Sequence, residues 1–201
     1  MSSQTNTLTE GPLAKQIFLV SLPLALSNLL VARFYGARHP KDVEKTVHSA
    51  AIISAVAGVV LLLIGLLGSP AMLRLLNTKP ELLDKATLYM QIYFCGMPAL
   101  ALYNFGNAVY SAIGNTKKPL YYLLFSGIVN VVLNLVFVIV CDLDVAGVAL
   151  ASIISQYLSA IFLTAALFRS REIYGLSPKL LRLHRKNCRE ILTLGIPAGL
   201  Q

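Results

Sequence analysis

Long stretches of the chain carry no charged side chain, and they predict helices that cross a membrane. Four such stretches separate charged residues and comprise 28, 31, 23 and 24 residues, at 46–73, 86–116, 119–141 and 145–168. A helix needs about 20 apolar residues to cross the bilayer core, and backbone groups in lipid must satisfy their own hydrogen bonds. The pattern therefore predicts a helical membrane bundle, to which a shorter uncharged run at 16–32 adds another span.

Glycine and proline residues mark the expected ends and bends of these helices. We expect an all-α polytopic bundle of about five transmembrane helices plus the start of a sixth, with spans at about Leu13–Ala32, Val47–Leu67, Ala86–Ile113, Leu120–Val140 and Val145–Phe168. The second span is expected to close at Gly68–Pro70, and the long third span to kink at Gly96–Pro98. A polar loop at 33–45 and an amphipathic connection at 71–85 complete the bundle.

Composition and charge agree with a membrane protein. Hydrophobic residues make up 56% of the chain and charged residues 13%, against about 25% charged in a soluble domain. Of the 17 Lys and Arg residues, 13 lie in three segments, at 33–45, 114–119 and 169–189, and the opposite connections at 68–85 and 141–144 hold three. The positive-inside rule places the basic segments in the cytoplasm. We therefore expect a multi-pass membrane protein, whose net charge of +8 orients helices in the bilayer and does not bind nucleic acid.

The chemistry available inside the predicted spans excludes an enzyme. All nine acidic residues lie outside the spans, and an ionisable residue within a span is the usual sign of function there. The cysteines Cys95, Cys141 and Cys188 show no metal-binding or CxxC spacing. No nucleophile–base pair, phosphate-binding loop or metal cluster is recognisable. The sequence predicts no catalytic residue, no metal and no bound cofactor.

Two asparagines are the strongest candidates for a site inside the membrane. Asn130 and Asn134 are four residues apart, so a helix places them on one face. Their amides can join neighbouring helices by hydrogen bonds, each contributing about 0.6 kcal/mol in lipid. They can also form a hydrogen-bond network or coordinate a cation through their oxygens, and both interpretations stay open. Asn107 and Ser152 are weaker candidates, for which ordinary helix packing is the alternative.

The beginning and the end of the chain resemble each other. Residues 15–26 align with residues 189–200 at an offset of 174, and the basic residue, the following polar residue, the isoleucine and the proline coincide. Internal repeats are typical of transporters. We expect the chain to contain one repeat unit and the start of a second.

Several segments together resemble the multidrug and toxic compound extrusion (MATE) transporters of bacterial type. The segments follow the family's order along nearly the whole chain, and this shared order makes the resemblance specific. The matching segments are Thr9–Ile17 with Ser21–Pro23, Phe34–Arg38 with Val47–Ala50, Tyr103–Gly106, Gly114–Pro119, Ser126–Asn134, Ala146–Ser152 and Ile196–Gln201.

The resemblance implies an incomplete N-terminal lobe. Members of the family carry twelve helices in two lobes of six, whereas here the second half of helix 1 and most of helix 2 are expected to be absent. The implied domains are a partial lobe at 1–168, a basic cytoplasmic linker at 169–188 and a truncated second repeat at 189–201. Residues 13–32 would then form one hybrid helix with an external N-terminus.

The resemblance also implies a function and a site. The chain would be a fragment of a secondary multidrug efflux transporter of the cell inner membrane, which exports small organic cations or other drugs in exchange for protons or sodium. Asn134 matches the helix 5 position that often carries a carboxylate in the family, and Asn107 and Ser152 would join Asn130 and Asn134 inside the lobe. The alternatives are a non-transporting membrane remnant or interaction protein, and a lipid-linked oligosaccharide flippase of the same superfamily.

Overall fold

In the computed structural model, residues 35–37 and 39–182 are described, and every regular element within them is a helix. The expected all-α fold is therefore confirmed for this part of the chain. The hybrid helix at 13–32 and the second repeat at 189–201 lie outside the described residues.

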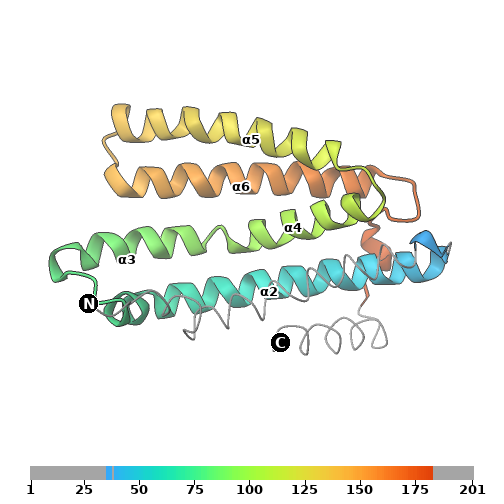
Figure 1. The fold of residues 1–201 in the computed structure, drawn as a ribbon, viewed down its shortest axis with the longest axis horizontal. Helices are drawn as coiled ribbons and strands as arrows, with labels where there is room; N and C mark the ends of the chain where they lie inside the picture. The colour runs from blue at the N-terminus through green and yellow to red at the C-terminus, as the bar shows by residue number, and fades with distance from the viewer. Residues whose placement is uncertain (1–34, 38, 183–201) are drawn as a thin grey trace, which may run out of the picture.

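The described helices lie side by side, and the chain reverses direction between successive passes (Figure 1). Contacts place α3 and α4 between α2 and α6, and α5 packs on α6. Three helical segments are long and apolar enough to cross a membrane: α2, α5 with η1, and α6. The elements are α2 (Pro40–Leu75), α3 (Pro80–Phe94), α4 (Met97–Ala112), α5 (Lys117–Leu135), the π-helix η1 (Val136–Val140), α6 (Asp144–Arg169) and the 3₁₀ turn η2 (Pro178–Leu180).

The third predicted span is broken where the sequence predicts a kink. Helix α3 ends at Phe94 and α4 begins at Met97, and Pro98 has no N–H with which to continue the helical ladder. The hydroxyl of Tyr157 on α6 donates to the main-chain oxygen of Cys95 at 3.0 Å. A neighbouring helix therefore satisfies a carbonyl at the break.

Helix α2 is longer than its apolar run, so the predicted loop at 33–45 is wrong from residue 40 onward. Pro40 occupies the first turn, where backbone N–H groups have no acceptor within the helix, so the missing N–H of proline costs no hydrogen bond. Asp42 in the same turn complements the positive end of the helix dipole. At 1.5 Å per residue, α2 is about 54 Å long, well beyond the roughly 30 Å of a hydrocarbon core.

The expected end of this span at Gly68–Pro70 is also wrong, because α2 continues through Pro70 to Leu75. A proline inside a helix removes the N–H that would bond the carbonyl four residues earlier, here that of Leu66. The side-chain amide of Gln91 on α3 donates to this Leu66 oxygen at 3.1 Å. The neighbouring helix thus replaces the missing donor, as prolines in transmembrane helices require.

Small residues bring the inner helices close together. A Cβ on Gly58 of α2 would meet the backbone of Pro98, and one on Gly106 of α4 would meet the side chain of Leu163 on α6. Close approach at small residues is the usual way in which helices pack in lipid. Helix α5 contrasts with this, since Pro119 and Ser126 are its only buried residues.

The connections sort into two groups at opposite ends of the bundle (Figure 1). The start of α2, the α4–α5 connection and residues 170–182 lie at one end, so the described parts of the three predicted cytoplasmic segments share it. At the other end, Lys85 and Asp144 form an ion pair with an Nζ–Oδ2 distance of 2.8 Å. The structure therefore groups the loops as the charge count predicts, and the side of the membrane stays a prediction.

Candidate functional site

A line of polar side chains crosses the interface between α5 and α6. Ser126, Asn130 and Asn134 follow one another at four-residue steps on α5, so they lie along one face of the helix. Helix α6 contributes Ser152 and Ser155. The side chains of Asn130, Asn134 and Ser155 hydrogen-bond to one another, whereas the hydroxyls of Ser126 and Ser152 donate to main-chain oxygens of their own helices.

The two asparagines and Ser155 form a chain of hydrogen bonds. Nδ2 of Asn134 donates to the main-chain oxygen of Asn130 at 3.0 Å and to its Oδ1 at 3.1 Å. Nδ2 of Asn130 donates to Oγ of Ser155 at 3.3 Å, which links α5 to α6. Oγ of Ser155 in turn donates to the main-chain oxygen of Ser152 at 2.8 Å. We call Asn130, Asn134 and Ser155 the amide network.

One acceptor of the amide network has no donor. Oδ1 of Asn134 is inaccessible to solvent, and no hydrogen bond reaches it from any described residue. A buried polar atom of this kind is uncommon and calls for an explanation. The π-helix η1 begins two residues later, and single π-turns occur frequently at functional sites. The Asn134 oxygen can accept a hydrogen bond from a ligand or coordinate a cation.

The structure treats the four predicted site residues differently. It brings Asn130 and Asn134 together, and it places Ser152 beside them through its main-chain oxygen. The Ser152 hydroxyl instead donates to the Val148 oxygen on its own helix at 3.0 Å. Asn107 on α4 is half-buried, and its side chain has no hydrogen bond with the described residues. Its role remains a prediction, as do those of the other three.

Ser155 belongs to the amide network but is not among the predicted site residues. It is 25 positions from Asn130 in the sequence, and only the packing of α5 on α6 brings the two together. The sequence gives only a weak indication of its role, because a serine in an apolar helix is also common where helices simply pack together.

Charged groups of the described chain lie near the ends of the helices rather than beside the amide network. Lys85, in the first turns of α3, is an example: the carboxylate of Asp144 accepts its hydrogen bond and attracts its charge, and both effects raise the pKa of Lys85. Within residues 35–37 and 39–182, no three His, Cys, Asp or Glu side chains are grouped to hold a metal ion. The amide network therefore offers only amides and hydroxyls to a ligand.

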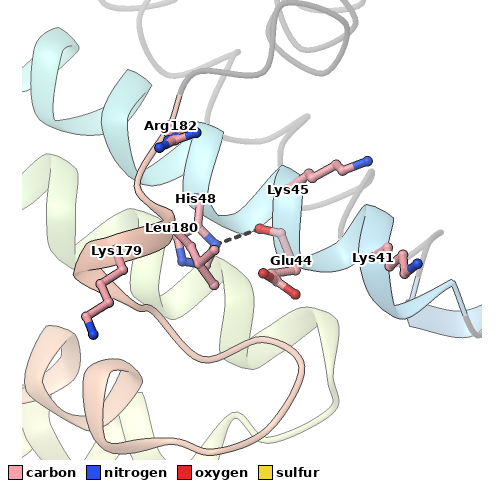
Figure 2. Close-up of a pocket in the computed structure, with 7 residues that line it drawn as sticks. All are labelled: Lys41, Glu44, Lys45, His48, Lys179, Leu180 and Arg182. Atoms are coloured by element: carbon pink, nitrogen blue, oxygen red, sulfur yellow. Dashed lines mark hydrogen bonds between the residues drawn. The ribbon is translucent and has the colours of Figure 1, made fainter.

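A second polar feature is a cleft of about 500 Å³ at the end where α2 begins (Figure 2). The imidazole of His48 lies at its base with only 1% of the residue exposed. Nδ1 of His48 lies 2.7 Å from the Glu44 main-chain oxygen, and Nε2 accepts the N–H of Ser177 at 3.0 Å. We call this feature the basic cleft, and it is lined by Lys41, Glu44, Lys45, His48, Lys179, Leu180 and Arg182.

The basic cleft could not be read from the sequence. Its two basic segments are more than 130 residues apart, and the contact of His48 with Ser177 spans 129 positions. The sequence indicates only that both segments are basic and on the same side of the membrane.

Comparison with known proteins identifies relatives of this chain. The family model MatE matches residues 15–136. The probable multidrug resistance protein YpnP of Bacillus subtilis (strain 168) is 34% identical over 133 residues, which cover 66% of this chain and 29% of YpnP. The multidrug export protein MepA of Staphylococcus aureus (strain bovine RF122 / ET3-1) is 26% identical over 185 residues, which cover 92% of this chain and 40% of MepA.

Solved structures show the same fold. A crystal structure of MATE in the bent conformation superposes with a TM-score of 0.84 at 22% identity, over 94% of this chain and 42% of that one. An outward-facing multidrug resistance MATE family transporter of the MOP superfamily superposes with a TM-score of 0.82 at 22% identity, with the same coverage. The chain thus spans less than half the length of these relatives.

Proposed function

The chain belongs to the MatE family, and from this premise we propose that it forms part of one lobe of a secondary multidrug efflux transporter. The proposed reaction exports small organic cations or other drugs in exchange for protons or sodium. Two observations support it: the relatives are named as multidrug resistance and export proteins, and the chain is a multi-pass helical membrane protein. A gradient, rather than a bound cofactor, would supply the energy.

One observation supports a binding site in particular: Oδ1 of Asn134 is buried, and no described residue donates a hydrogen bond to it. In an interface that is otherwise apolar, an acceptor without a donor favours a ligand that supplies one, or a cation that the oxygen coordinates. An asparagine does not titrate, so the amide network would contribute binding and not proton release. Asn107 and Ser152 would extend this surface within the lobe.

We also propose that the protein lies in the inner membrane of the cell, with the basic end of the bundle facing the cytoplasm. Eight described Lys and Arg residues lie at that end, against three at the other. Basic residues near the ends of transmembrane helices favour the cytoplasmic side. The amide network would then lie within the bilayer, between two charged surfaces.

Binding of a lipophilic cation to the full chain in lipid nanodiscs tests this function. Tetraphenylphosphonium should bind saturably, and Asn134→Leu should weaken binding at least threefold, because it removes the unpaired oxygen. Asn115→Leu, in the α4–α5 connection, makes the same chemical change away from the amide network and should leave the affinity unchanged.

The outcomes separate the proposal from its alternatives. Absence of saturable binding by the wild-type chain would refute the transport function and favour a non-transporting membrane protein. Binding that Asn134→Leu leaves intact would refute the role of the amide network alone. Binding of a lipid-linked oligosaccharide in preference to the cation would favour a flippase, although the four long charge-free runs contain no basic residue to hold its phosphates within the bilayer.

A further inference from the structure

The basic cleft is held in place by a fixed reversal of the chain after α6. The Leu176 N–H donates to the Leu167 oxygen at 3.0 Å, and the side chain of Leu176 is buried in the core. The Gly175 N–H donates to the Glu172 oxygen at 2.8 Å, and a Cβ at Gly175 would meet the Ser170 oxygen. These contacts hold residues 170–177 in place. The chain that follows therefore passes beside the start of α2, where residues 179, 180 and 182 line the basic cleft.

His48 completes the attachment of this segment to α2. Its Nε2 accepts the Ser177 N–H, so Nδ1 carries the proton and donates to the Glu44 oxygen. Both ring nitrogens are therefore used, and the imidazole is neutral in this arrangement. His48 acts as a structural support beneath the cleft, and basic side chains from both segments surround it.

The charge of the lining is strongly positive. Three lysines and Arg182 surround the cleft together with one acid, Glu44, which gives a formal charge of 4 − 1 = +3 while His48 is neutral. The positive end of the α2 dipole adds to this field, and Asp42 in the first turn offsets part of it. His39 at the N-cap provides no side-chain hydrogen bond to the first turn. The electrostatics favour an anion with several acceptor oxygens.

The position of the cleft indicates where that anion comes from. The charge-free run of α2 begins at Thr46, immediately after Lys45, so the lining residues lie at the level of the lipid headgroups. Leu180, which is 47% exposed, lies among the basic side chains. An apolar group beside the cations suits a phosphate attached to a lipid better than a phosphate free in solution.

We propose that the basic cleft binds the phosphate of an anionic phospholipid headgroup. Basic pockets at the ends of transmembrane helices are suited to such headgroups. The bound lipid would join the start of α2 to the segment after α6, because Lys41 and Lys45 come from one and Lys179 from the other. This proposal depends on the membrane setting of the chain and not on its transport of any drug.

Native mass spectrometry of the full chain in detergent micelles tests the proposal. The wild-type chain should bind phosphatidylglycerol more tightly than phosphatidylcholine. The double substitution Lys45→Gln with Lys179→Gln should weaken phosphatidylglycerol binding roughly tenfold to thirtyfold, since each lysine near an anionic lipid surface contributes about 1 kcal/mol to the binding free energy. The matched control, Arg74→Gln with Lys79→Gln at the opposite end, removes the same charge and should change affinity less than twofold.

Three results would overturn the proposal. Equal weakening by the two double substitutions would show a general effect of net charge. Equal affinity of the wild-type chain for the two lipids would show that no anionic headgroup is selected. Binding of inorganic phosphate with the same dependence on Lys45 and Lys179, and with full displacement of phosphatidylglycerol at millimolar concentration, would assign the cleft to a soluble phosphate instead.

Discussion

Gln91 should matter for stability only because Pro70 interrupts α2. The side chain of Gln91 donates to the Leu66 oxygen at 3.1 Å, and this is the oxygen that Pro70 leaves without its helical donor. Gln91→Leu keeps the volume of the side chain and removes the donor. The carbonyl is then left unsatisfied in a part-buried site, which costs about 1 to 3 kcal/mol, and measured values in membranes fall toward the lower end.

Pro70→Ala supplies the test of this reasoning, because it restores the N–H that bonds the Leu66 oxygen within α2. The loss of unfolding free energy caused by Gln91→Leu should therefore be smaller in the Pro70→Ala background than in the wild-type chain, by about 1 kcal/mol. Gln156→Leu is a matched control, because it makes the same chemical change at an amide whose oxygen has no partner among the described residues. Its effect should be the same in both backgrounds.

Reversible unfolding of the full chain in mixed micelles, followed by circular dichroism, gives the four free energies of this cycle. A Gln91→Leu cost that is equal with and without Pro70→Ala would refute the account, whatever its size. A coupling of similar size between Pro70 and Gln156 would also refute it, because the coupling would then not arise from the Leu66 carbonyl.

Two further predictions concern the ends of the bundle. In a background where Cys95 and Cys188 are serine, a membrane-impermeant maleimide should label the exposed Cys141 in intact cells. When Cys141 is also replaced, a cysteine introduced by Lys117→Cys should react only in inverted vesicles. The opposite labelling pattern would show that the basic end faces outward. His48→Leu should speed hydrogen exchange at Ser177 about fivefold or more, because the amide loses its acceptor, and unchanged exchange would contradict the structural role of the imidazole.

The helical passes could be predicted from the sequence because their signal is local. Charge-free runs alone indicate α6, which extends only one residue beyond each end of the predicted span. The break near Pro98 was also predictable, since the missing N–H acts within its own helix. Pro70 misleads for the opposite reason: its effect is cancelled by Gln91, which is 21 positions away and comes into contact only when α3 packs on α2.

The candidate sites also differ in whether they depend on local helical spacing or on long-range packing. Asn130 and Asn134 share a face by helical spacing, and the structure bonds them to each other as that spacing allows. Ser155 depends on the packing of α5 on α6, and the basic cleft depends on a chain reversal that ends more than 100 residues from α2. No periodicity in the sequence encodes either contact.

No carboxylate among residues 35–37 and 39–182 lies beside the amide network, and this leads to a last prediction. The described acidic residues lie near helix ends, so infrared difference spectra of the wild-type chain between pH 5 and 8 should show no carboxyl band from the bilayer interior. Asn134→Asp should create one, because burial disfavours the charged form of a carboxyl group. A wild-type band that persists after replacement of each loop acid would contradict this view of the site. The lack of a band in Asn134→Asp would show that position 134 is not as enclosed as its unpaired oxygen indicates.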